Sequence, residues 1–184
     1  MKPGPALLAD LTERARACGR AAEPKLAGLD ETQAAHAALA ALREAGLTAF
    51  TVPQKYGGAD VGALCARKPL VSVRALCALR DELAWHSGML DVMLVMQGLG
   101  SFPITFAGNE KLIADVLPAV ARGESIAAFA LTEPDAGSSL ADIATHAVAK
   151  GQSWRLNGQK TFISNAGIAD HYSVLARTSG ASTL

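Results

Sequence analysis

The sequence predicts an α+β protein: an N-terminal all-α domain over residues 1–123, followed by the start of a small antiparallel β domain over residues 124–184. Up to about residue 121, apolar residues recur every three or four positions, the period of an amphipathic helix. After Ser125 the period becomes two, and Gly-containing turn pairs separate short apolar runs, as in strands. Helices followed by strands favour segregated parts over alternating βαβ units.

Five helices are expected in the first part. Pro24 and Gly28 separate the first two, and Asp30 or Thr32 caps the second. Asn109 is expected to cap the last helix. The apolar spacing places the helices at about residues 6–17, 31–45, 72–87, 89–99 and 110–121.

The fourth of these helices is apolar on every side, which predicts that it is buried against neighbours or a ligand. We expect it to end near Gly98 and Gly100. The segment between the second and third helices, 46–62, contains Pro and Gly pairs that indicate a structured loop.

Four strands are expected after the helices, at 126–133, 145–150, 153–164 and 171–177. Lys150-Gly151 and Asn157-Gly158 are the turn signals between them. So few strands leave at least one open edge, and an independent β domain would seldom stop there. We therefore expect the sequence to be that of a truncated protein.

The composition excludes several classes of protein. Half of the residues are apolar, which is sufficient for a core and excludes wholesale disorder. Lys plus Arg equals Asp plus Glu, at 17 each, so we expect no nucleic-acid partner. No uninterrupted apolar run approaches the roughly 20 residues of a membrane span. Cys18, Cys65 and Cys77 form no metal-ligand spacing, so we expect no metal, buried thiols and a reducing, cytoplasmic setting.

The segment LTEPDAGSSL, residues 131–140, directly follows an apolar strand. Thr132 carries a hydroxyl at the strand end, and Pro134 turns the chain. Gly137 allows the backbone to approach a ligand, with the Ser138 hydroxyl free to bind it. Taken alone, the segment fits either a ligand-binding loop or an ordinary Pro-Gly-Ser loop.

The segment NGQKTFISNAG, residues 157–167, is expected to be a turn followed by a strand that ends in Phe162, Ile163 and Ser164. Strand alternation would place Phe162 and Ser164 on one face, where an aromatic ring and a hydroxyl suit a planar ligand with a polar edge. A core Phe beside a strand-end Ser is the alternative.

Together these segments resemble the acyl-CoA dehydrogenase family, over almost the whole chain and in the family's order. The resemblance is carried by GLTAFTVPQKYGG (46–58), DELAWHSG (81–88), GLGSFPITFAGNEKLIADVLPAVARGE (98–124), FALTEPDAGSSL (129–140), NGQKTFISNAG (157–167) and YSVLAR (172–177).

The resemblance implies a helical domain, a small β domain and a C-terminal four-helix bundle, with FAD between the last two. The implied reaction removes the α-proton and β-hydride of an acyl-CoA thioester and leaves the enoyl-CoA and reduced flavin. The family's electron acceptor is an electron-transfer flavoprotein, and its members are homotetramers or dimers.

The resemblance also implies which residues bind the cofactor. Phe162 replaces the family's Trp beside the flavin ring, and Ser164 replaces the Thr whose hydroxyl reaches flavin N5. Ser138 matches the serine that contacts both flavin and CoA, while Ser139 replaces the usual acid. The implied cofactor-binding residues are Phe129, Leu131, Thr132, Gly137, Ser138, Phe162, Ile163 and Ser164.

For the substrate, the resemblance implies contacts from Ser138 and from the apolar helix. On that helix Asp91, Val95 and Leu99 are four apart and share a face. A carboxylate at the end of an acyl tunnel would disfavour a long alkyl chain, so the hypothesis is a short or functionalised acyl group. A stripe of core residues is the alternative.

The family's catalytic glutamate lies in the C-terminal bundle, beyond residue 184, so no catalytic residue is assigned. The chain is therefore expected to be incomplete and inactive alone. Two other functions stay open: a flavin-dependent monooxygenase on the same fold, and a non-enzymatic remnant or split-enzyme half.

Overall fold

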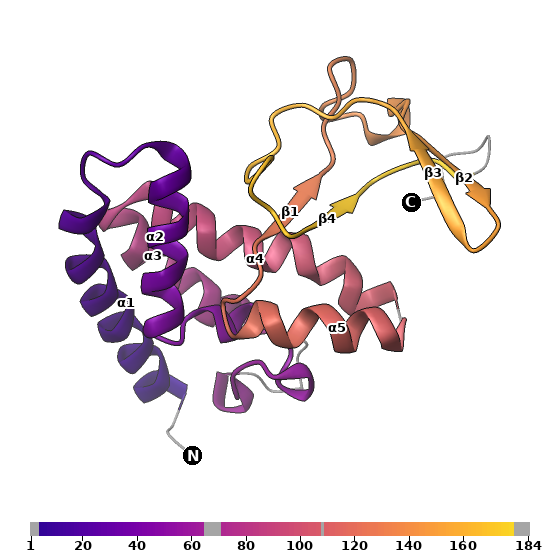
Figure 1. The fold of residues 1–184 in the computed structure, drawn as a ribbon. Helices are drawn as coiled ribbons and strands as arrows, with labels where there is room; N and C mark the ends of the chain where they lie inside the picture. The colour runs from indigo at the N-terminus through magenta and orange to yellow at the C-terminus, as the bar shows by residue number, and fades with distance from the viewer. Residues whose placement is uncertain (1–3, 65–70, 108, 179–184) are drawn as a thin grey trace.

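The structure is a computed structural model that describes residues 4–64, 71–107 and 109–178. Helices form one body, and two small sheets extend from one side of it (Figure 1). The elements are α1 (Gly4–Leu26), α2 (Glu31–Glu44), α3 (Val73–His86), α4 (Gly88–Ala107), α5 (Glu110–Ala121), β1 (Ala127–Ala130), β2 (His146–Lys150), β3 (Ser153–Asn157) and β4 (His171–Val174). Short 3-10 turns, including Thr48–Thr51, occupy the predicted loop after α2.

Polar caps begin the helices where the sequence predicts them. The Asp30 side chain accepts a hydrogen bond from Gln33 N, and the Gln33 side chain in turn accepts one from Asp30 N. Asn109 Oδ1 accepts from Leu112 N at the start of α5. These bonds satisfy amides that have no partner within the helix.

Two helices extend past their predicted ends. Helix α1 continues through Pro24, which lies in its last turn and removes one N–H donor there. Helix α4 continues through Gly98 and Gly100 to Ala107. Gly100 is inside this helix because β1 packs against it: a Cβ there would lie 2.7 Å from the Ala127 Cβ.

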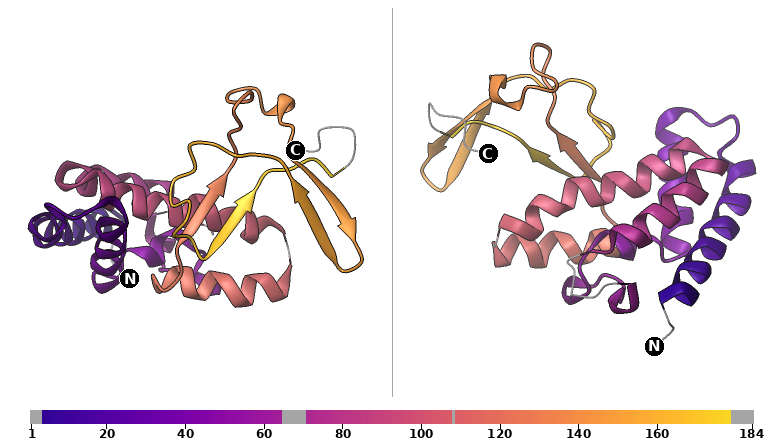
Figure 2. Two further views of the ribbon diagram at one scale, coloured as in Figure 1. Left: turned by 45° about the horizontal axis from the view of Figure 1, so that its top comes forward. Right: turned by 180° about the vertical axis from the view of Figure 1, so that it is seen from behind.

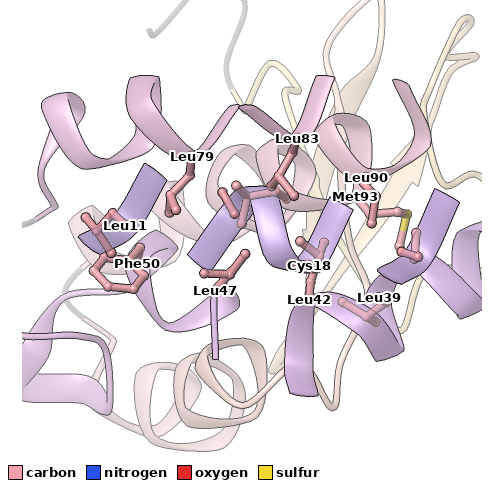
Figure 3. Packing of buried hydrophobic residues seen from close by; sticks show 14 of the residues in the cluster. Leu11, Cys18, Leu39, Leu42, Leu47, Phe50, Leu79, Leu83, Leu90 and Met93 are labelled. Carbon is pink, nitrogen blue, oxygen red and sulfur yellow. The ribbon is translucent and has the colours of Figure 1, made fainter. Parts of the chain in front are cut away.

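The main core lies among α1, α2, α3 and the first half of α4 (Figure 3). Its largest fully buried side chains include Leu11, Leu42, Leu83, Leu90 and Met93. Cys18 is also buried here, as predicted, and burial raises the pKa of its thiol. Cys77 of α3 is exposed, so its predicted burial is wrong, and Cys65 lies outside the described residues.

Helix α4 runs through the centre of the molecule, in contact with α2, α3, α5 and β1. By length and composition alone it could cross a membrane, but Leu90, Met93 and Leu94 are fully buried, as in a core helix. The helix is buried against these neighbours over part of its surface, but Leu99 is 46% exposed. One face of α4 is therefore uncovered.

The fold class is confirmed, with a helical part followed by a small β region, but the strand pairing is mixed. Strands β2 and β3 form the predicted antiparallel hairpin around Gly151, which has a φ of 62°. Strands β1 and β4 pair in parallel, from Ala127 beside His171 to Ala130 beside Val174 (Figure 2). The long connection that contains the hairpin permits this parallel return.

The strand predicted over 153–164 ends at Asn157, and Asn157-Gly158 does not begin another hairpin. Beyond it the chain has irregular backbone and turns. Gly158 packs tightly on Thr145: a Cβ at this position would lie 2.6 Å from the Thr145 Cα. This contact directs the chain toward the end of β1.

Candidate functional site

The structure brings together the two sequence motifs that precede and follow the hairpin. Thr161 N donates to Thr132 O over 3.0 Å, and Lys160 Nζ donates to Leu131 O over 2.8 Å. The residues after β1 and the Phe162 segment are therefore neighbours, although about 30 positions separate them in the sequence.

A buried ion pair lies beneath this junction. Lys160 Nζ is 2.8 Å from Glu133 Oε1, and the two side chains are only 11% and 5% exposed. The Glu133 carboxylate also accepts hydrogen bonds from Ala144 N (2.6 Å) and Thr145 N (3.0 Å). Sequence reasoning missed this pair. The available signal was a charged residue placed directly after an apolar strand in one motif and a lysine in the other.

The environment of Glu133 sets its ionisation. Burial opposes the charged form, but hydrogen bonds from Lys160, Thr145 and Ala144 outweigh it and lower the pKa of Glu133 from 4.5 to about 2. The carboxylate is ionised near neutral pH and bound on both oxygens. It is therefore a structural anion and is not available to take a proton from a substrate.

The lowered pKa predicts an acid-sensitive β region. Because the folded pKa lies below the unfolded one, the stabilisation from Glu133 is complete above about pH 4.5 and is lost as the pH falls toward 2. In urea unfolding at a series of pH values, the variant Glu133→Gln should show a shallower loss of stability across this window. An equal loss of unfolding free energy with falling pH in the wild-type protein and Glu133→Gln would contradict this role of Glu133.

Phe162 has an unusual backbone and an uncovered ring. Its φ is 55° and its side chain is 90% exposed. A bulky residue in the left-handed region costs about 1–3 kcal/mol, and such strain concentrates at binding sites. Asn165, also left-handed at φ 64°, secures the segment by donating from Nδ2 to Ala127 O. The predicted strand alternation of Phe162 and Ser164 is wrong, because this segment is a turn.

The other predicted cofactor residues surround the same junction. Phe129, Leu131 and Thr132 are half-buried on β1 and just after it. Hydrogen bonds between Glu133 and Ala136 close the turn that leads to the exposed Gly137 and Ser138. A Cβ on Gly137 would meet no atom within 4 Å, so the space around this turn is open.

A pocket of about 420 Å³ connects the Phe162 segment to the helices. Ile163 and Ser164 line it on one side, with Ala35 of α2 and Met89 and Val92 of α4 on the other. Two of the predicted cofactor residues therefore face the first turns of the central helix.

The predicted acyl-binding residues lie elsewhere on α4. Val95 and Leu99 line an apolar groove of about 560 Å³ between α3 and α4. Gln97 and Gly100 of the same helix contact β1 instead: Gln97 Oε1 accepts from Ala127 N, and Gly100 meets Ala127. The groove and the motif junction are thus on different sides of α4.

Asp91 does not present a free carboxylate to that groove. Arg80 of α3, which lines the groove, donates from Nε and Nη2 to the two carboxylate oxygens of Asp91 over 2.6 and 2.8 Å. The charge of Asp91 is compensated by this pair. The pair reduces the cost that this carboxylate would impose on a long acyl chain, and the short-acyl hypothesis stays a prediction.

The sequence matches the acyl-CoA dehydrogenase N-terminal domain over residues 10–124 and the acyl-CoA dehydrogenase middle domain over residues 128–183. The chain belongs to the acyl-CoA dehydrogenase family.

Among its relatives is a cyclohexane-1-carbonyl-CoA dehydrogenase of Geobacter metallireducens, 35% identical over 77% of this chain and 35% of the relative. The solved structure of a Bacillus anthracis acyl-CoA dehydrogenase complexed with FAD is similar, with a TM-score of 0.77 and 27% identity over 94% of this chain and 29% of the other. A Mycobacterium smegmatis glutaryl-CoA dehydrogenase structure has a TM-score of 0.76 and 29% identity, over 94% and 43%. The chain spans about a third of the length of the curated relatives it matches.

Proposed function

We propose that this chain supplies flavin-binding residues for the FAD-dependent α,β-dehydrogenation of an acyl-CoA thioester. One observation carries the proposal: the Phe162 ring is exposed on strained backbone, and the preceding residue, Thr161, donates its amide hydrogen to Thr132 O. The similar Bacillus anthracis structure, which contains FAD, supports it.

FAD would supply the hydride acceptor when bound. The residues of this chain bind and orient it. The exposed Phe162 face suits packing against a planar ring, and the Thr132 and Ser164 hydroxyls suit hydrogen bonds to polar ring edges. Ser138, in the open turn, is proposed to contact both the flavin and the CoA part of the substrate.

The substrate and partners follow from the same proposal. The acyl group is proposed to extend along α4, where Val95 and Leu99 offer apolar surface. Reduced flavin would pass its electrons to an electron-transfer flavoprotein in the cytoplasm. Assembly as a homo-oligomer would cover exposed side chains such as Trp154 and Leu156 of the hairpin.

The test is a titration of the purified chain with FAD, followed by flavin fluorescence and absorbance. The wild-type chain should perturb both signals, and Phe162→Ala should weaken binding about 10-fold or more, since stacking of a base on an aromatic side chain contributes about 1–3 kcal/mol. Phe106→Ala is the matched control, because Phe106 is 67% exposed near the end of α4 and lines neither the pocket beside Ile163 nor the groove between α3 and α4.

A wild-type chain that leaves the flavin signals unchanged would overturn the proposal. Butyryl-CoA and octanoyl-CoA, added anaerobically, then test substrate binding through shifts in the absorbance spectrum of the bound flavin. Glu133, the acid beside Thr132, is not expected to act as the base that leads to flavin reduction, because its carboxylate is fully engaged.

A further inference from the structure

Among the residues that the structure describes, the Glu133–Lys160 pair is an ionic contact of the site that the proposed function does not use directly. Lys160 Nζ binds both Leu131 O and Glu133 Oε1, so a single ammonium group joins the end of β1 to the segment that begins at Thr161. The Glu133 carboxylate extends the same network to the backbone of Ala144 and Thr145, at the start of the hairpin. The side chains of Glu133 and Lys160 therefore connect three segments: the end of β1, the start of the hairpin and the segment before Phe162.

An ion pair is a costly way to fill this space. Removing two charges from water carries a penalty that apolar side chains of similar size do not incur. What an ion pair adds is geometric specificity, because its donors and acceptors fix the separation and register of the chain segments that they join. Here the pair fixes Lys160, two positions before Phe162, relative to Leu131 and Glu133, the residues on either side of Thr132.

We infer that Glu133 and Lys160 are positioning residues for the flavin: they hold the Thr132 and Phe162 segments at the separation that the flavin ring requires. The inference rests on the proposed function, because it assigns the pair a role in binding FAD. Neither side chain needs to contact the cofactor, since the pair acts through Leu131 O and through the Thr161–Thr132 hydrogen bond.

The test compares FAD affinity among three variants of the full chain. The double variant Glu133→Gln/Lys160→Met removes both charges and leaves no unpaired buried ion, so it should fold. Its Kd for FAD should rise 10-fold or more. Lys160→Arg keeps the charge and several donors and should stay within about threefold of wild type. As a matched control, Arg16→Met/Glu82→Gln removes the ion pair between α1 and α3, whose closest atoms are 2.8 Å apart, and should stay within twofold.

Two further readouts separate positioning from general stability. Bound flavin should lose its resolved absorbance fine structure in the double variant only. The Thr161 amide should exchange faster with solvent in the double variant without FAD, because its bond to Thr132 O loosens.

Each result decides between the two claims. Equal FAD affinity of the double variant and wild type, or an equal loss in the Arg16/Glu82 control, would overturn the inference while the proposed function stands. A wild-type chain that binds no FAD would overturn the proposed function, and the inference with it.

Discussion

Replacing Lys160 alone by methionine is expected to lower the free energy of unfolding by about 3–5 kcal/mol, the range for breaking one side of a buried ion pair. The substitution leaves the Glu133 carboxylate 5% exposed, without its cation and still bound to two amides. Urea unfolding followed by Trp154 fluorescence measures the effect, because Trp154 lies on β3. A Trp85→Phe background removes the only other tryptophan, on α3.

The paired control is the double variant Glu133→Gln/Lys160→Met. Because it leaves no uncompensated charge, it should recover more than half of the stability lost in Lys160→Met. If Lys160→Met costs less than about 1 kcal/mol, the pair is exposed to water in solution and the buried geometry is wrong.

Gly58→Ala is also expected to have a large effect, lowering the free energy of unfolding by about 3 kcal/mol. A Cβ at Gly58 would lie 1.7 Å from Val52 O, 2.5 Å from Val52 C and 2.9 Å from Ala49 O. All three are backbone atoms, so no side chain can rotate out of the way. The loop would have to open, which would disturb Thr48 and its hydrogen bond to Ala121 O in α5.

Gly88→Ala is the control for this substitution. Gly88 is the first residue of α4, and a Cβ there would meet no atom within 4 Å. Its change in stability should be within about 0.5 kcal/mol of zero, as for other open surface positions. Thermal unfolding of both variants, followed by helical circular dichroism, checks the difference. Equal melting temperatures would show that the Val52 turn adapts without cost.

The sequence was sufficient for features that depend on neighbours in the chain. Capping by Asp30 and Asn109 and the existence of five helices follow from local patterns, and the structure confirms them. The end of α4 was mispredicted because Gly100 is a helix breaker only in isolation. In the molecule its missing side chain is what lets β1 approach the helix, and no local pattern carries that information.

In the candidate site, too, local sequence patterns predicted some features and not those that depend on tertiary structure. The two motifs identified Thr132 and Phe162, but Thr-Phe-Ile-Ser alternates like a strand, and only the fold reveals the positive φ of Phe162. The sequence pattern also did not predict the ion-pair partners of Glu133 and Asp91. Lys160 is 27 residues from Glu133, and Arg80 is on the helix before Asp91. Pairing across such distances is decided by tertiary packing.

The parallel pairing of β1 and β4 has a consequence during synthesis. When β1 has packed on α4, the hydrogen-bonding edge that pairs with β4 lacks its partner until β4 emerges about 40 residues later. At roughly 5–20 residues per second, this exposure lasts about 2–8 s on the ribosome. An unpaired edge is a template for association with other chains. Slow translation of residues 131–170 would therefore lengthen the period in which the nascent chain is prone to aggregate, and a chaperone bound at that stage would cover the exposed edge.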